Sequence, residues 1–253
     1  MKGREDSKAL LAGRKHKPAT EAALVAAAHE LKAPLVLIKH LAQSLIDPST
    51  LAANQQWDYL QRIQMTADRS LRFVQHLTLS YRLQTDPRVV PFDFALEPLS
   101  MNKICNDALD EMTPYAKQHK QQLRLSGLHC PHLVLANEDI LRDIVINLVD
   151  NAIQHNPSGN VVDVAAECRG EQVRLVVRDN GGGVTLSELR SLRQNLGAQP
   201  QPLSGRSGTS GLGLYIVQQF AQAMGGNLGL GRAPQGTAFF VDLLRSRQLS
   251  LLP

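Results

Sequence analysis

Apolar residues at steps of four and three follow one face of the segment between residues 24 and 45. The members of this seam are Leu24, Ala28, Leu31, Leu35, Ile38, Ala42 and Leu45. A mean step of about 3.5 residues is that of a helix packed lengthwise against a partner helix. A second apolar face follows in Leu60, Ile63, Ala67, Leu71, Val74, Leu77 and Tyr81. The pattern predicts two long helices, at about 20–46 and up to about 83, joined by a short connector at 47–50.

Two long helices with so short a connector must run antiparallel. A lone helical hairpin leaves an apolar face open, so a dimeric four-helix bundle is the economical solution. The alternative is that both helices dock on the C-terminal domain of their own chain. The strict period of the seam favours the dimer.

Thr85, Asp86 and Pro87 break the helical pattern and mark a domain boundary. The predicted domains are an N-terminal linker at 1–19, the helical hairpin at 20–86, a second domain at 87–247 and a tail at 248–253. In the second domain we expect helices at about 100–119, 138–154 and 211–224. Strands are expected at about 89–94, 122–126, 132–136, 161–168, 172–178, 227–231 and 237–243. A long polar stretch at 181–210, with at most a short helix near 187–195, is typical of a functional lid.

Composition narrows the function classes. The net charge of +4 is mild and forms no basic stripe with interleaved aromatics, which argues against nucleic-acid binding. Cys105, Cys130 and Cys168 are odd in number and far apart, which predicts free thiols in a reducing compartment. No apolar run reaches the roughly 18 residues that span a bilayer, and the first 17 residues lack the apolar stretch of a signal peptide. We therefore expect a soluble, cytoplasmic protein.

His29 lies at the edge of the seam, next to Glu30 and five residues before Pro34. Glu30 can hold the imidazole ring through one nitrogen and leave the other as a nucleophile. Pro34 lacks the amide that would bond the Glu30 carbonyl, so we expect a looser helix beside the histidine. A histidine in such a place is otherwise an ordinary surface residue, as we expect for His40, His76 and His119. The group His129, Cys130 and His132 is a poor match for a closed zinc site.

Asparagines and glycines stand out in the C-terminal half. Asn147 and Asn151 are four residues apart and share one face of the predicted helix at 138–154. Their amide oxygens suit Mg²⁺ that keeps water and phosphate ligands, although buried amides that tie a loop to the helix fit the same pattern. Asp179 ends a Val-rich strand and is followed by Gly181 and Gly183. Its carboxylate can accept the exocyclic amine of adenine where glycines let a ligand approach, but a tight turn has the same sequence.

Gly211, Leu212 and Gly213 begin the predicted helix at 211–224 and offer backbone amides to phosphates. In order and spacing these segments resemble the sensor histidine kinase core of two-component systems, over about residues 20–243. The segment from His29 to Leu35 matches the phosphoacceptor box of that family. Asn147 and Asn151 match its asparagine box, 179–183 its first glycine box and 210–214 its second.

The resemblance implies an α+β fold. It consists of a helical hairpin that forms a dimeric four-helix bundle, followed by an α/β sandwich ATP-binding domain of the histidine kinase, Hsp90, MutL and gyrase type. It also implies an ATP-dependent protein-histidine kinase that autophosphorylates His29 and passes the phosphoryl group to an aspartate in the receiver domain of a response regulator. In this assignment Glu30 orients the ring of His29, and Asn151 binds Mg²⁺. The other nucleotide-binding residues are Asn147, Asp179, Gly181, Gly183, Gly211, Leu212 and Gly213, with Arg206 as a lid cation.

One position argues for a kinase over a hydrolase. Relatives that hydrolyse ATP carry a glutamate four residues before the Mg²⁺-binding asparagine, and here that position is Asn147. Gln154 departs from the family because a lysine is common there, and the lid lacks the usual Phe-rich segment. These departures keep open a degenerate dimeric scaffold that binds nucleotide without phosphotransfer. Because no sensory segment precedes the hairpin, we expect the signal to enter through a separate sensor or membrane partner, unless the chain is a fragment.

Overall fold

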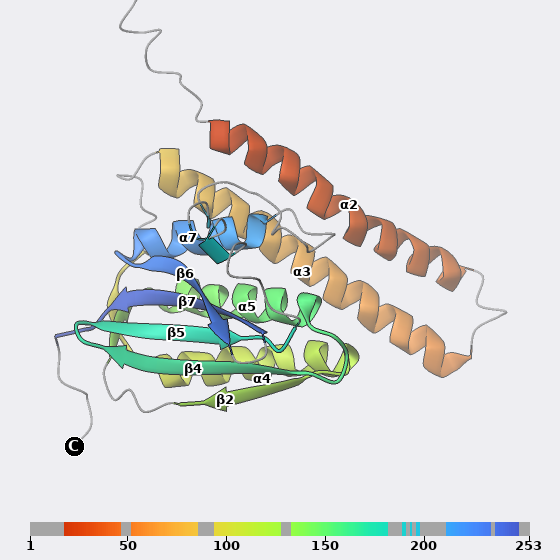
Figure 1. Cartoon of the computed structure of the whole chain (residues 1–253). Helices are drawn as coiled ribbons and strands as arrows, with labels where there is room; N and C mark the ends of the chain where they lie inside the picture. Colours follow the sequence, from red (N-terminus) through yellow and green to blue (C-terminus); the bar gives the residue numbers. More distant parts are fainter. Residues whose placement is uncertain are drawn as a thin grey trace, which may run out of the picture.

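The computed structural model describes residues 18–46, 52–85, 94–127, 133–181, 189–190, 193, 196–197, 211–233 and 236–247. Two long antiparallel helices, α2 (Pro18–Ile46) and α3 (Ala53–Thr85), form a hairpin beside a second domain (Figure 1). Both helices match the predicted segments. Helix α2 continues through Pro34 without a break, so the proline removes one N–H group and leaves the helix intact. The predicted connector at 47–50 lies outside the described residues.

A five-stranded sheet in the order β2-β4-β5-β7-β6 forms the centre of the second domain. Its strands are β2 (Gln122–Ser126), β4 (Val161–Arg169), β5 (Gln172–Arg178), β6 (Asn227–Ala233) and β7 (Gly236–Leu244). Only β2 and β4 pair in parallel, and β4 and β5 form the predicted antiparallel hairpin. Helices α4 (Met101–Gln118), α5 (Glu138–His155) and α7 (Leu212–Ala223) cover one face of the sheet (Figure 1). Each lies within two residues of its predicted bounds.

A short two-stranded sheet, β1 (Glu97–Leu99) with β3 (Val134–Ala136), closes the domain near the start of α4 and α5. Ser100 and Asn137 cap these two helices, and their side chains accept from the N–H groups of Lys103 and Ile140. A strand was expected at 89–94; most of that range lies outside the described residues, and β1 begins three residues later. Most of the helix expected near 187–195 also lies outside them.

Alternation along the strands separates the buried face of the sheet from the exposed one. Val164 of β4, Leu175 of β5 and Val241 of β7 are fully buried under the helices. Antiparallel sheets commonly bury one face in this way and leave the other to solvent. The main core of the domain therefore lies between the sheet and α4, α5 and α7. Ala165, Val176 and Ala238 form a small second buried cluster on the other face of the sheet.

The hairpin docks on this helix layer through α3. His76 of α3 is only 7% exposed, its Nε2 lies 2.7 Å from Asp143 Oδ2 of α5, and its ring meets the edge of Phe220 of α7. The expectation of a surface position for His76 is wrong, because α3 packs against α5 and α7. Helix α3 thus docks on the C-terminal domain of its own chain; this contact uses one face of α3 and is compatible with a dimer of hairpins.

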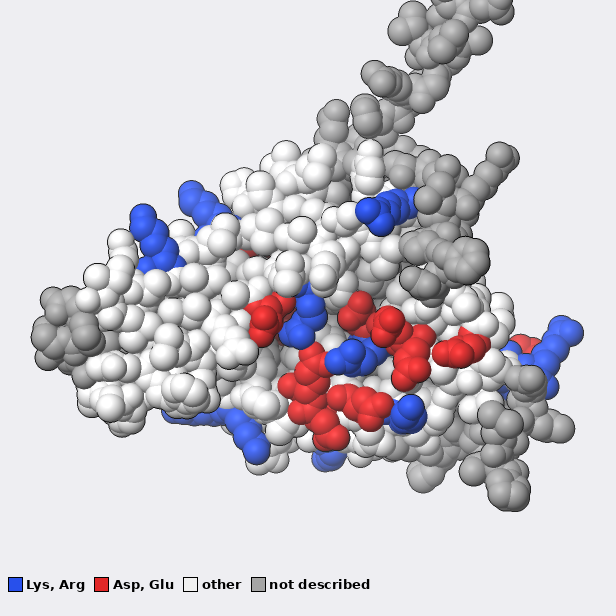
Figure 2. Space-filling view, turned by 180° about the vertical axis from the view of Figure 1, so that it is seen from behind, with Lys and Arg blue, Asp and Glu red and all other residues white. Residues whose placement is uncertain are grey.

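Ion pairs extend the docking contact. Arg69 of α3 bonds Asp150 of α5 at 2.8 Å, and Arg72 bonds Glu111 of α4 at 2.7 Å. Arg142 of α5 bonds the other oxygen of Glu111. Seen from behind, the molecule shows acidic side chains gathered in one region with basic ones set among them (Figure 2). This contact holds α3 across the surface of α4 and α5.

The apolar seam of α2 divides between two environments. Its members Leu31, Ile38, Ala42 and Leu45 are half-buried, whereas Leu24 and Leu35 are each 58% exposed. The buried residues of α2 are Ala23, Ala27 and Leu41, each one position before a member of the seam. On α3 the exposed apolar residues are Trp57, Leu60, Leu71, Val74 and Tyr81. Each helix thus has an apolar stripe that the docked hairpin leaves uncovered.

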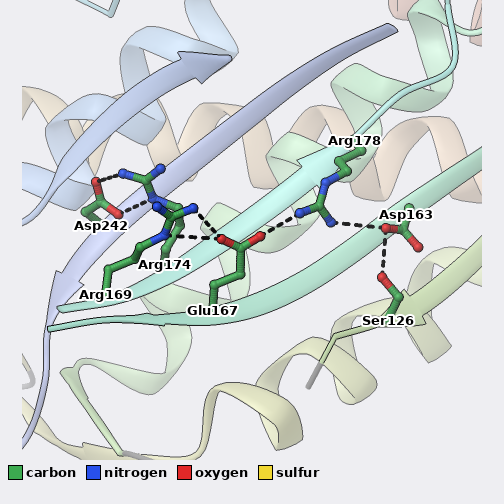
Figure 3. A network of polar contacts seen from close by, with 7 residues as sticks. All are labelled: Ser126, Asp163, Glu167, Arg169, Arg174, Arg178 and Asp242. Carbon is green, nitrogen blue, oxygen red and sulfur yellow. Dashed lines mark hydrogen bonds and ion pairs between the residues drawn. The ribbon is translucent and has the colours of Figure 1, made fainter. Parts of the chain in front are cut away.

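Charged residues in alternating pairs cover the open face of the sheet (Figure 3). Arg174 of β5 forms two hydrogen bonds with Asp242 of β7, at 2.6 and 2.7 Å, and its guanidinium lies 3.7 Å from the ring centroid of Phe240. Arg178 bridges Asp163 and Glu167 of β4, at 3.2 and 2.6 Å. Opposite charges on neighbouring strands keep this face polar and stabilise the cross-strand register.

Candidate functional site

Helix α5 carries both predicted asparagines. Asn147 Nδ2 donates to the Asp143 carbonyl oxygen at 2.8 Å and lies 3.3 Å from His76 Nδ1. A Cβ placed on Gly213 would lie 4.0 Å from Asn147 Oδ1. The start of α7 therefore comes close to Asn147, as the assignment of both residues to one nucleotide site requires.

Asn151 is half-buried one turn further along α5. Its Nδ2 is fully buried and has no hydrogen-bond partner within the part of the chain that the structure describes. Buried amide groups are normally bonded, since an unmet donor costs about 1–3 kcal/mol. Among the described residues, no loop bonds to this Nδ2 group, which leaves it for a ligand.

Asp179 directly follows β5 and is closely surrounded by backbone groups. The residue is 1% exposed, and its Oδ1 accepts from the N–H groups of Gly181 and Thr237, each at 3.1 Å. Gly236 is required beside it, because a Cβ there would lie 2.0 Å from the Asp179 carbonyl oxygen. Two backbone donors and a missing side chain thus fix the direction of this carboxylate.

The first turn of α7 follows a residue in the left-handed conformation. Gly211 has a φ of 69° and no side chain with which to cap the helix. Leu212 is fully buried and anchors the turn in the core. The first N–H groups of a helix have no partner within it, and they carry the positive end of its dipole. The geometry suits an anionic ligand beside Asn147.

His29 and Glu30 lie on α2, in the helical hairpin and not in the second domain. His29 is exposed, and Glu30 is half-buried near Arg69. Burial lowers the pKa of Arg69, but the negative charge of Asp150, with smaller effects of Tyr115 and Glu30, outweighs it and raises that pKa. Glu30 is therefore close enough to Arg69 for its negative charge to favour the charged guanidinium. The predicted Gly183 and Arg206 lie outside the described residues.

Sequence reasoning missed several residues that shape this site. Arg69 contacts a residue of α5 that is 81 positions away in the chain, and His76 one that is 71 positions away. No local sequence pattern predicts contacts over such separations. Asn156, at the end of α5, has the sequence context of an ordinary turn residue before proline. Only its burial and its position beside Asp179 single it out.

The cysteines correct one expectation. Cys105 is a free, fully buried thiol, and burial raises its pKa to about 12. Cys168, at the end of β4, forms a disulfide, so the prediction of three free thiols is wrong. Cys130 and the histidines around it lie outside the described residues.

Comparison with known proteins agrees with the predicted fold and family. Residues 136–247 match the family model described as "Histidine kinase-, DNA gyrase B-, and HSP90-like ATPase". The chain is 29% identical over 221 residues to the sensor protein kinase PmrB of Pseudomonas aeruginosa, covering 86% of this chain and 43% of PmrB. It is 33% identical over 216 residues to the sensor protein QseC of Escherichia coli K12, covering 83% of this chain and 44% of QseC.

A solved structure extends the likeness to both domains. Full-length ShkA superposes with a TM-score of 0.58 at 23% identity, over 92% of this chain and 47% of ShkA. The relatives define the class: the chain corresponds to the core of sensor histidine kinases, with a helical hairpin followed by a domain of the histidine kinase, gyrase B and HSP90 type. It spans less than half the length of PmrB and QseC.

Proposed function

We propose that this chain is an ATP-dependent protein-histidine kinase. It autophosphorylates His29 and passes the phosphoryl group to an aspartate of a response regulator. The observation that carries the proposal is the arrangement along α5, with Gly213 beside Asn147 in the middle of the helix and the Asp179 group beside its C-terminal end. Asn147 and Asn156 are nine residues apart, which corresponds to a rise of about 14 Å along a helix. This length accommodates the phosphates near Asn147 and the base near Asp179.

ATP and Mg²⁺ fit the residues present. The amide oxygen of Asn151 would hold Mg²⁺, whose charge would neutralise the phosphate oxygens. Asp179 would accept the exocyclic amine of adenine, and the first turn of α7 would hold phosphates. The relative ShkA was solved in complex with AMPPNP, an ATP analogue, which supports an adenine nucleotide as the ligand.

The acceptor is a side chain because no carboxylate stands where a hydrolase activates water. A ring nitrogen of His29 forms a bond to the γ-phosphorus, and the bond to the bridging oxygen breaks, so that ADP leaves with the electron pair. The developing positive charge on the ring requires a nearby acceptor, which is the role we assign to Glu30. Positioning and charge neutralisation supply most of the rate enhancement in such transfers.

We further propose that the chain acts as a homodimer. The uncovered stripe on α3, with Leu60, Leu71, Val74 and Tyr81 spaced at multiples of about 3.5 residues, is 41–59% exposed and suits a four-helix bundle with a second copy. Docking of the opposite face of α3 on α5 leaves this stripe available.

The proposed setting is the cytoplasm, where ATP and a response regulator receiver domain would meet the exposed His29. The signal would arrive from a separate sensor or membrane partner. No helix among the described residues is long and apolar enough to cross a membrane.

The test is labelling of the chain by γ-labelled ATP with Mg²⁺. We expect an acid-labile, base-stable phosphate that is lost in His29→Gln and in Asn151→Asp. His40→Gln is the matched control, since His40 is also exposed and lies three helical turns further along α2. Full labelling of His29→Gln would reject this acceptor. ATP binding without any labelling, and without transfer to a panel of regulators, would favour the degenerate scaffold.

A further inference from the structure

Asn156 has a buried side-chain amide that bonds to no other described group. It is 8% exposed, and neither its Oδ1 nor its Nδ2 has a hydrogen-bond partner among the residues that the structure describes. An amide in this state is destabilising, because both groups have lost water and gained nothing. Such groups in a folded protein require an explanation, and a ligand is one.

The backbone of Asn156 holds its side chain in place. Its N–H donates to the Ala152 carbonyl at 3.0 Å, and its C=O accepts from Gln121 Nε2 at 3.0 Å. Gln121 is itself 4% exposed, and its Nε2 also donates to the Ile153 carbonyl at 2.7 Å. These hydrogen bonds hold the backbone of Asn156 at the end of α5. The position from which its side chain extends is therefore fixed.

The amide lies next to the adenine end of the proposed site. A Cβ placed on Gly181 would lie 3.3 Å from Asn156 Oδ1 and 3.3 Å from Asp179 Oδ1. The two side chains thus approach the same glycine from α5 and from the end of β5. A side chain at Gly181 would crowd both oxygens, so the glycine allows Asn156 and Asp179 to lie side by side at the edge of the proposed adenine pocket.

We propose that Asn156 is a second base-reading residue, which acts with Asp179 to select adenine; this rests on the proposed binding of ATP. A side-chain amide offers a donor and an acceptor side by side. Adenine presents the matching pair, an exocyclic N–H donor next to a ring-nitrogen acceptor, and asparagine is a common partner for it. Asp179 takes one hydrogen of the exocyclic amine, and Asn156 Oδ1 takes the other while Nδ2 donates to the ring nitrogen. Guanine places an oxygen in this position, where it would face the Asp179 carboxylate.

The experiment measures Mg²⁺-nucleotide binding to the full chain by calorimetry, with ATP and with purine riboside triphosphate, which lacks the exocyclic amine. Asn156→Ala is expected to weaken ATP binding at least about fivefold, the lower end for one paired amide. The ratio of the affinity for ATP to the affinity for the purine analogue should also fall. Asp179→Asn serves as the positive control. The matched control is Asn160→Ala, which removes a bond to the Asn180 carbonyl oxygen at 3.1 Å and should leave the preference unchanged.

A second variant separates recognition from folding. Asn156→Leu replaces the amide with an apolar group of similar size, so the unfolding midpoint without nucleotide should be unchanged or higher while ATP binding weakens. ATP affinity within twofold of wild type in both variants would overturn the inference. So would equal weakening towards ATP and the purine analogue. A wild-type chain that binds no ATP would overturn the proposed function itself, and the inference with it.

Discussion

Replacing His76 with phenylalanine tests the docking of the hairpin. The change keeps a ring against Phe220, whose centroid lies 5.6 Å from that of His76, and removes both ring nitrogens. It eliminates the 2.7 Å contact of Nε2 with Asp143 and the 3.3 Å contact of Nδ1 with Asn147. Asn147 keeps its bond to the Asp143 carbonyl oxygen, so the main loss is one hydrogen bond to a carboxylate.

A hydrogen bond to a charged group contributes about 1.5–3 kcal/mol. The Asp143 side chain remains 22% exposed, and water can replace part of the lost bond, which places the expected loss near 1.5–2 kcal/mol. Urea unfolding of the full chain at pH 7 measures this change. His40→Phe is the control, because His40 is exposed on α2 and its replacement should alter stability by no more than about 0.5 kcal/mol. If the two variants lose equal stability, His76 does not hold the hairpin to α5.

Two further perturbations address the open sheet face and the uncovered stripe of α3. Burial raises the pKa of the Asp163 carboxyl, but hydrogen bonds from Arg124, Ser126 and Arg178 outweigh this and hold the pKa below its usual value. The stabilisation by Asp163 is therefore complete above the unfolded pKa, near 3.9, and is lost as pH falls through the lower folded pKa. In denaturation curves Asp163→Asn should lose about 1–3 kcal/mol at pH 7 and progressively less below pH 4; a loss independent of pH would contradict the ionic role. Leu71→Glu should turn the dimer into a monomer in sedimentation, because Leu71 is 59% exposed and a charge there would have to be buried between copies; an unchanged dimer would show that the bundle forms elsewhere.

The order and type of most elements could be predicted from the sequence because they depend on local regularities. Apolar spacing located α2 and α3, and α4 and α5 lie within two residues of their predicted bounds. The asparagines of α5, Asp179 and the glycines before α7 were also visible, since chemistry at a ligand requires particular residue types at particular steps. Periodicity could not say which apolar face meets which neighbour. The seam of α2 therefore divided, with Leu31 half-buried in the hairpin and Leu35 exposed.

The tertiary structure alone decided how the two domains meet and which polar groups are left for a ligand. His76 and Arg69 became docking residues because α3 packs on α5, a contact between segments more than 70 residues apart. Cys168 formed a disulfide although its sequence spacing predicted a free thiol. Asn156 acquired its proposed role only when the end of α5 came beside Gly181. The burial of a side chain and its hydrogen-bond or ion-pair partners depend on residues that are far away in the sequence. Only folding brings these residues together, so neither property can be predicted from local sequence.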